Sequence, residues 1–71
     1  MLDATGLRCP LPVLRARKAM KSVEPGAVLE VLATDPGAVA DFQAFCQTTG
    51  DELLSWEEAE GRFTFQIRKA G

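Results

Sequence analysis

Two prolines separated by a single residue, Pro10 and Pro12, constrain the local fold of this chain more than any other feature. Proline fixes φ near about −65° and has no amide hydrogen, so an α-helix accepts it only in its first turn. We therefore predict a helix from Pro10 to about Ser22, with Cys9 as its N-cap. A cysteine there lies at the positive end of the helix dipole and follows Arg8, and both features favour the thiolate over the thiol. The sequence thus predicts a nucleophilic sulfur.

The spacing of the cysteines limits the chemistry of that sulfur. The residue three positions after Cys9 is Pro12, so the Cys-x-x-Cys pattern of a dithiol redox site is absent. Cys46 falls near the end of a second predicted helix that runs in roughly the same direction as the first, which separates the two sulfurs by on the order of 15 Å. We expect no disulfide between them. A single activated thiol suits group transfer, in which it accepts a sulfur atom as a persulfide and passes it on.

The rest of the chain alternates between strand and helix patterns. We predict strands over residues 2–5, 27–33, 51–57 and 62–69 and a second helix from Pro36 to Gly50, with Asp35 as its N-cap. The short link between the last two strands indicates an antiparallel hairpin. The order β-α-β-α-β-β predicts one domain over residues 1–71. Its fold class is an α/β (α+β) two-layer sandwich, in which a four-stranded mixed sheet carries two helices on one face.

Apolar periodicity predicts which face of each element is buried. On the first helix the core arc comprises Pro12, Val13, Ala16, Ala19, Met20 and Val23. On two strands the inward residues are Leu29, Val31, Ala33, Phe63, Phe65 and Ile67. Cys46 belongs to the apolar stripe of the second helix and is expected to be a buried structural residue. Alternation does not decide whether Leu54 and Trp56 or Leu53 and Ser55 face the core.

The Cys9-Pro10-Leu11-Pro12 segment, preceded by residues 2–8 and followed by a basic helix, resembles the hallmark Cys-Pro-x-Pro motif of the TusA/SirA family of small sulfur-carrier proteins. The family has similar residues at Asp35-Pro36, Asp41, Phe45-Cys46, Glu52-Leu53 and Ile67-Arg68-Lys69. The resemblance implies a sheet of strand order 1-2-4-3 with the last strand antiparallel to the others. It also implies a sulfur carrier, or sulfurtransferase, that holds sulfane sulfur on Cys9 and serves tRNA thiolation or other sulfur metabolism.

The resemblance implies partners on both sides of the transfer. The donor would be a protein such as a cysteine desulfurase or a rhodanese-type sulfurtransferase, and the acceptor a protein with a reactive cysteine. No pyridoxal phosphate, nucleotide or metal site is visible, and the chain has no histidine. The expected covalent group is therefore only the persulfide on Cys9, with no independent turnover chemistry evident.

Each residue near the predicted thiol has an expected role. Pro10 and Pro12 fix the turn, while Arg8 and, more weakly, Arg17 favour the anionic sulfur. We expect Asp35 to be a helix cap and Asp41 a solvated helix charge.

The basic residues are concentrated around the first helix. The net charge is −2, yet five of the eight basic residues fall in a stretch without acids, namely Arg8, Arg15, Arg17, Lys18 and Lys21. Such a field would steer an acidic partner surface towards the thiol. Leu11 and Leu14 lie off the core arc, and they are either ordinary surface leucines or a docking patch rimmed by Arg15, Lys18 and Lys21. Without aromatic residues on this helix, direct nucleic-acid binding is disfavoured.

Two other functions remain open from the sequence. Cys9 could merely cap the helix of a non-catalytic regulatory or protein-interaction module, or act as a redox switch through sulfenylation.

No apolar run has the length to span a bilayer, and the chain begins with Met1-Leu2-Asp3 rather than a basic segment followed by an apolar one. We expect a cytoplasmic protein without membrane contact, and nothing requires more than a monomer.

Overall fold

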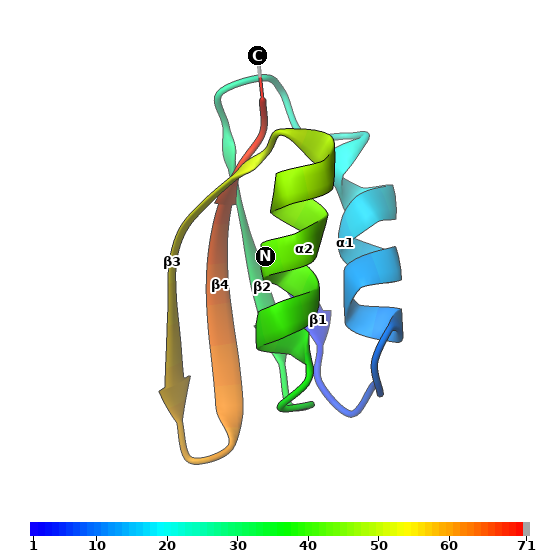
Figure 1. The fold of residues 1–71 in the computed structure, drawn as a ribbon, viewed down its shortest axis with the longest axis vertical. Coiled ribbons are helices and arrows are strands. Elements are labelled where there is room, and N and C mark those ends of the chain that lie inside the picture. Colours follow the sequence, from blue (N-terminus) through cyan, green and yellow to red (C-terminus); the bar gives the residue numbers. More distant parts are fainter. Residues whose placement is uncertain (71) are drawn as a thin grey trace.

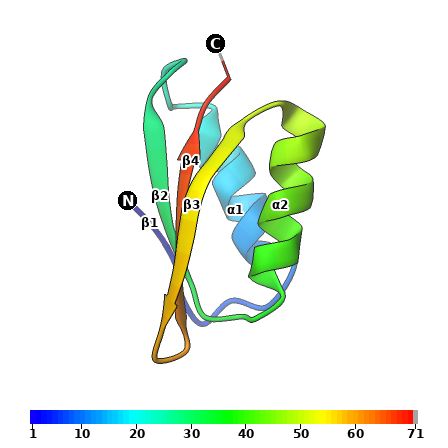
Figure 2. The ribbon, with the colours of Figure 1, turned by 60° about the vertical axis from the view of Figure 1, so that its left-hand side comes forward.

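The computed structural model describes residues 1–70 and shows a four-stranded sheet with two helices packed on one face (Figures 1 and 2). The elements in chain order are β1 (Leu2–Ala4), α1 (Leu11–Met20), β2 (Val28–Ala33), α2 (Ala38–Thr49), β3 (Glu52–Ala59) and β4 (Arg62–Arg68). The sheet order is β1-β2-β4-β3, with β1 parallel to β2 and β4 antiparallel to both of its neighbours. The predicted fold class and sheet order are confirmed. Over residues 1–70, neither helix has the length and apolarity needed to cross a membrane.

Each helix begins one or two residues later than predicted, because a short turn precedes it. The amide of Leu11 donates to the carbonyl of Arg8 at 2.8 Å, and Pro10, rather than Cys9, is the N-cap of α1. The Cys9–Pro10 peptide bond is cis. In the same way, Ala38 donates to the carbonyl of Asp35 at 3.0 Å, and α2 follows Gly37. The predicted N-cap positions of Cys9 and Asp35 are therefore wrong.

The core lies between the helices and the sheet. The rings of Phe42 on α2 and Phe65 on β4 are 4.5 Å apart between centroids, and both side chains are fully buried. The predicted inward residues of β2 and β4 are buried, and Pro12, Ala16 and Met20 provide the buried face of α1. Small residues such as Ala16, which is fully buried, allow the helix to pack closely on the sheet. The apolar periodicity thus predicted the core face correctly.

A β-bulge in β3 answers the question that alternation left open. Leu53 pairs with Ile67, but the next pair joins Ser55 to Gln66, so Leu54 is an extra residue. After the bulge, Trp56 lies opposite Phe65 on the helix side of the sheet. Neither of the two predicted sets is therefore complete, because the bulge changes the parity of the strand between Leu53 and Trp56.

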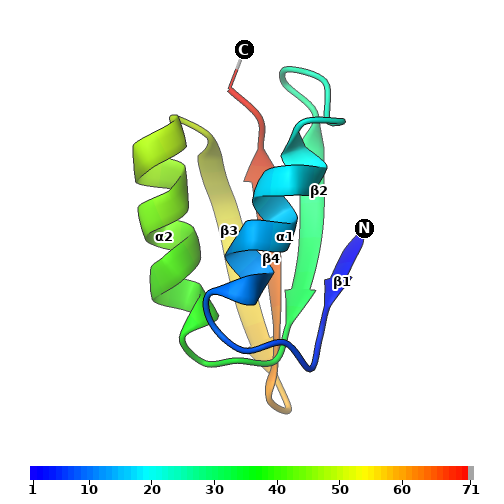
Figure 3. The same ribbon diagram turned by 90° about the vertical axis from the view of Figure 1, so that its right-hand side faces the viewer.

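The parallel arrangement of the two helices places their first turns at one end of the molecule (Figure 3). The loops that lead from β1 to α1 and from β2 to α2 lie at this end, where the carboxyl ends of the two parallel strands meet. The β3–β4 hairpin also turns at this end (Figure 1). Residues just before the two helices, far apart in the chain, therefore come together.

Candidate functional site

The carboxylate of Asp35 joins the segments that precede the two helices. Its Oδ2 accepts a hydrogen bond from the amide of Cys9 at 2.6 Å, and its Oδ1 accepts one from the amide of Gly37 at 2.8 Å. These bonds, first that of Cys9 and then that of Gly37, hold the pKa of Asp35 below its ordinary value, and the charge of Arg8 adds to the effect. An ionised carboxylate can accept both bonds at once. Asp35 thus fixes Cys9 against the start of α2.

The backbone of Gly37 lies directly beside the cysteine side chain. A Cβ atom added at Gly37 would be 3.6 Å from Cys9 Cβ and 3.9 Å from Cys9 Sγ. Since Gly37 is the N-cap of α2 and Pro10 that of α1, the exposed Cys9 lies at the N-terminal ends of both helices.

The thiol of Cys9 donates a hydrogen bond to Oδ2 of Asp41, in the first turn of α2. This bond is the main reason why the pKa of Cys9 is raised; partial removal from water and the charges of Asp41 and Asp35 act in the same direction. These contacts shift the pKa of Cys9 in the direction opposite to the one expected from the helix end and from Arg8. Arg8 acts on Asp35, and neither Arg8 nor Arg17 is among the groups that shift the thiol. The hydrogen bond to Asp41 has the protonated thiol as its donor.

The sequence predicts a solvated helix charge at Asp41, whereas the structure places its carboxylate against the sulfur of Cys9. The sign that could have found it is its position four residues after Gly37. In a helix that begins beside Cys9, this spacing brings a side chain one turn further along the same face.

A groove of about 330 Å³ runs between the two helices and begins at Pro10, next to Cys9. Arg17 on α1 and Asp41 on α2 both line it. The remaining lining residues are Val13, Leu14, Ala44, Phe45, Thr48 and Thr49. Of the two proline residues in the motif, Pro12 is buried in the first turn of α1 and Pro10 is exposed at the mouth of the groove. The site is thus continuous with a largely apolar surface.

The outer surface of α1 carries the predicted apolar pair and basic side chains. Leu11 and Leu14 are 45% and 50% exposed, which confirms that they do not belong to the core. Three basic residues of the same helix and its end are also exposed, namely Arg15, Lys18 and Lys21. The one ion pair in residues 1–70 joins Arg68 to Glu52, so these basic groups are not neutralised by neighbouring acids.

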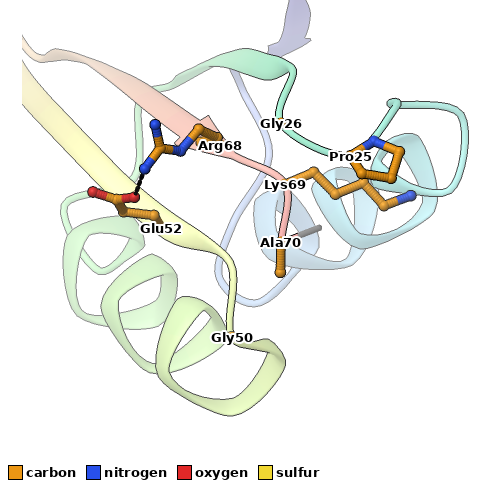
Figure 4. A pocket seen from close by; sticks show the side chains of 7 residues that line it. All are labelled: Pro25, Gly26, Gly50, Glu52, Arg68, Lys69 and Ala70. Atoms are coloured by element: carbon orange, nitrogen blue, oxygen red, sulfur yellow. Dashed lines mark hydrogen bonds and ion pairs between the residues drawn. The ribbon is translucent and has the colours of Figure 1, made fainter.

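The second cysteine and a surface depression far from Cys9 offer no comparable chemistry. Cys46 is a buried free thiol, as predicted, and burial raises its pKa, with a smaller contribution from the charge of Asp51. A depression of about 540 Å³ lies at the opposite end of the molecule and is lined by Pro25, Gly26, Gly50, Glu52, Arg68, Lys69 and Ala70 (Figure 4). The ammonium group of Lys69 donates to the carbonyl of Met20, and Arg68 pairs with Glu52. The exposed sulfur is therefore at Cys9.

Together, the fold and the site define a class of protein: a small two-layer α+β domain that presents one exposed thiol where the starts of two parallel helices meet. A family model described as sulfurtransferase TusA matches residues 1–69. The chain belongs to the TusA family of sulfur carrier proteins, which confirms the family and the sulfur-carrier function expected from the Cys-Pro-x-Pro motif.

Individual relatives agree with this assignment. The chain is 54% identical over 69 residues to the sulfur carrier protein TusA of Allochromatium vinosum, covering 97% of this chain and 91% of that protein. It is 46% identical over 68 residues to the sulfur carrier protein TusA of Pseudomonas entomophila, covering 96% and 85%. Among solved structures, the crystal structure of a SirA-like protein from Desulfitobacterium hafniense has a TM-score of 0.84 at 29% identity and covers 99% of this chain and 96% of that one.

The double hydrogen bond of Asp35 leads to a prediction about stability. Replacing Asp35 with alanine removes both acceptors, and we expect the Tm to fall by about 4–8 °C in a thermal unfolding experiment. Asp35→Asn keeps one side-chain oxygen, so its Tm should lie between that of the parent and that of Asp35→Ala. Because the pKa of Asp35 is lowered in the folded state, its stabilisation is present above about pH 4 and is lost as the pH falls through the folded-state pKa. Equal Tm values for all three proteins at pH 7 would contradict this role.

Proposed function

We propose that Cys9 is the residue that carries the sulfur. The supporting observation is that Cys9 is the one exposed thiol in residues 1–70, since Cys46 is buried. Its sulfur would attack the terminal sulfur of a donor persulfide and form a new S–S bond while the donor thiol leaves. An acceptor cysteine would then take the sulfane sulfur by the same exchange. The donor supplies the chemical energy, so the carrier needs no cofactor of its own.

The neighbouring residues keep this thiol in place for exchange. We propose that Pro10 and Pro12 fix the turn and that Arg8 balances the charge of Asp35, since Arg8 lowers the pKa of Asp35. Arg17 lines the groove that begins beside Cys9. A persulfide extends about 2 Å beyond Sγ, and we propose that Arg17 favours that anionic sulfur rather than the resting thiol.

We propose that partner proteins dock on the exposed surface of α1. Leu11 and Leu14 offer apolar contact, and Arg15, Lys18 and Lys21 form a basic rim that attracts an acidic surface. Donors of this kind include a cysteine desulfurase or a rhodanese-type sulfurtransferase, and the acceptor is a protein with a reactive cysteine, as in tRNA thiolation or another route of sulfur metabolism. Because the site needs a free thiol, we also infer a reducing, cytoplasmic location. One chain supplies the whole site, so we expect a monomer.

The carrier role is tested by loading the purified protein from a cysteine desulfurase supplied with labelled cysteine. We expect intact mass to show the gain of one sulfur atom, and digestion to place the label on Cys9. Cys9→Ser should accept none, because a hydroxyl cannot form the persulfide, whereas Cys46→Ala should load as the parent does.

Three outcomes would contradict the proposal. Label on Cys46 would move the site, and a Cys9→Ser protein that still supports sulfur transfer would favour an interaction module in which Cys9 is dispensable. A gain of oxygen instead of sulfur would favour a redox switch.

The docking surface has a separate test in the rate of loading from a protein donor. Replacing Arg15 and Lys18 together by glutamate should slow loading by about tenfold or more at low salt, because it reverses the field that steers the donor. The difference should shrink at high salt. Arg62→Glu changes an exposed basic residue on β4 and serves as the control. A double variant that loads as fast as this control at low salt would exclude α1 as the docking surface.

A further inference from the structure

The contact between Cys9 and Asp41 depends on a proton that sulfur carriage removes. In the resting protein the thiol uses this proton to donate a hydrogen bond to Oδ2 of Asp41. A thiol sulfur bears a single hydrogen, so the bond has no substitute donor on Sγ. If Cys9 carries sulfur as proposed, loading therefore removes this hydrogen bond.

Loading can be written as an exchange in which atoms and electrons balance. The Cys9 thiol and a donor persulfide anion, R–S–S⁻, give Cys9–S–S⁻ and R–SH. The bond between Sγ and the sulfane sulfur forms, the S–S bond of the donor breaks, and its electron pair stays on the donor sulfur. The proton lost from Sγ is balanced by the proton gained by that donor sulfur, and there is no net oxidation.

After loading, Sγ has a sulfur neighbour in place of its hydrogen. It then offers only lone pairs to a carboxylate that is itself only an acceptor, so the favourable hydrogen bond is replaced by repulsion. The second carboxylate, Asp35, accepts a hydrogen bond from the amide of Cys9, and its negative charge also acts on the sulfur. Both carboxylates therefore stabilise the empty thiol more than they stabilise the loaded sulfur.

We propose that Asp41 sets the strength with which Cys9 holds sulfur, by stabilising the empty thiol over the persulfide. Asp41 thereby shifts the exchange equilibrium towards release, so that the carrier gives its sulfur readily to an acceptor. A carrier must release its sulfur as well as bind it. A contact made only in the empty state favours release of the sulfur without a change of fold.

The variant Asp41→Asn separates this role from a structural one. Asparagine has nearly the same shape, removes the negative charge, and presents an amide group that can donate to the lone pairs of a loaded Sγ. The other charges around the thiol remain in place: Asp35 in the loop before α2, Arg8 beside Asp35, and Arg17 across the groove from Asp41. Glu57→Gln is a matched control, because it removes one negative charge from an exposed position on β3 opposite Thr64.

The experiment measures the loading equilibrium in a buffer of glutathione persulfide and glutathione at a fixed ratio, without oxygen. Intact mass gives the fraction of protein that carries one extra sulfur. We expect the loading constant to rise about two- to fivefold in Asp41→Asn, the range that exposed charged contacts produce. Release to an added acceptor thiol should slow by a similar factor. Glu57→Gln should match the parent.

A loading constant in Asp41→Asn that equals or falls below that of the parent would overturn the proposal. Asp41→Ala is the second variant; it removes the carboxylate without adding a donor and should also raise the constant, although by less. Parent protein that takes up no sulfur at all would instead contradict the carrier role of Cys9. The two failures can therefore be distinguished.

Discussion

The site depends on one carboxylate that bridges two loops. Asp35 accepts hydrogen bonds from the amides of Cys9 and Gly37, and so connects the segment before α1 to the N-cap of α2. The sheet makes this possible, because β1 and β2 are adjacent and parallel and end at the same edge. Without this connection, the exposed loop that contains Cys9 would have few contacts to define the place of its sulfur. The fold thus brings two distant segments together, and Asp35 fixes them.

In this arrangement two carboxylates, rather than the arginines, shift the pKa of the sulfur. The helix ends favour negative charge, yet the hydrogen bond to Asp41 and the charges of Asp41 and Asp35 raise the pKa of the thiol. A raised pKa keeps the resting sulfur protonated and limits its reaction with stray electrophiles. The basic residues Arg15, Lys18 and Lys21 are exposed on α1 and just after its end.

Much of the fold could be predicted from the sequence, for identifiable reasons. The prolines at the start of α1, the left-handed Gly50 at the end of α2 and the alternation of Phe63, Phe65 and Ile67 are local patterns with a direct structural meaning. The bulge at Leu54 was not predictable, because it depends on which residues of β4 face β3.

The charged neighbours of the Cys9 sulfur could not be predicted from the sequence either. Arg8 is adjacent to Cys9 in the chain, whereas Asp41 follows it by 32 residues, so chain proximity pointed to the wrong neighbour. Only the parallel packing of the two helices brings Asp41 to the sulfur. The buried state of Cys46 followed from its apolar stripe, but the opposite surroundings of the two thiols emerge only in three dimensions.

The central claim is that the resting sulfur of Cys9 is a neutral thiol held by a carboxylate. The most direct measurement is a pH titration of the protein followed by the ¹³Cβ chemical shift of Cys9, with the Cys46 signal removed by substitution with alanine. We expect the midpoint of ionisation to lie above about 8.5, the value of an ordinary cysteine. A midpoint below that value would show that the helix ends and the nearby arginines dominate, and would contradict the account.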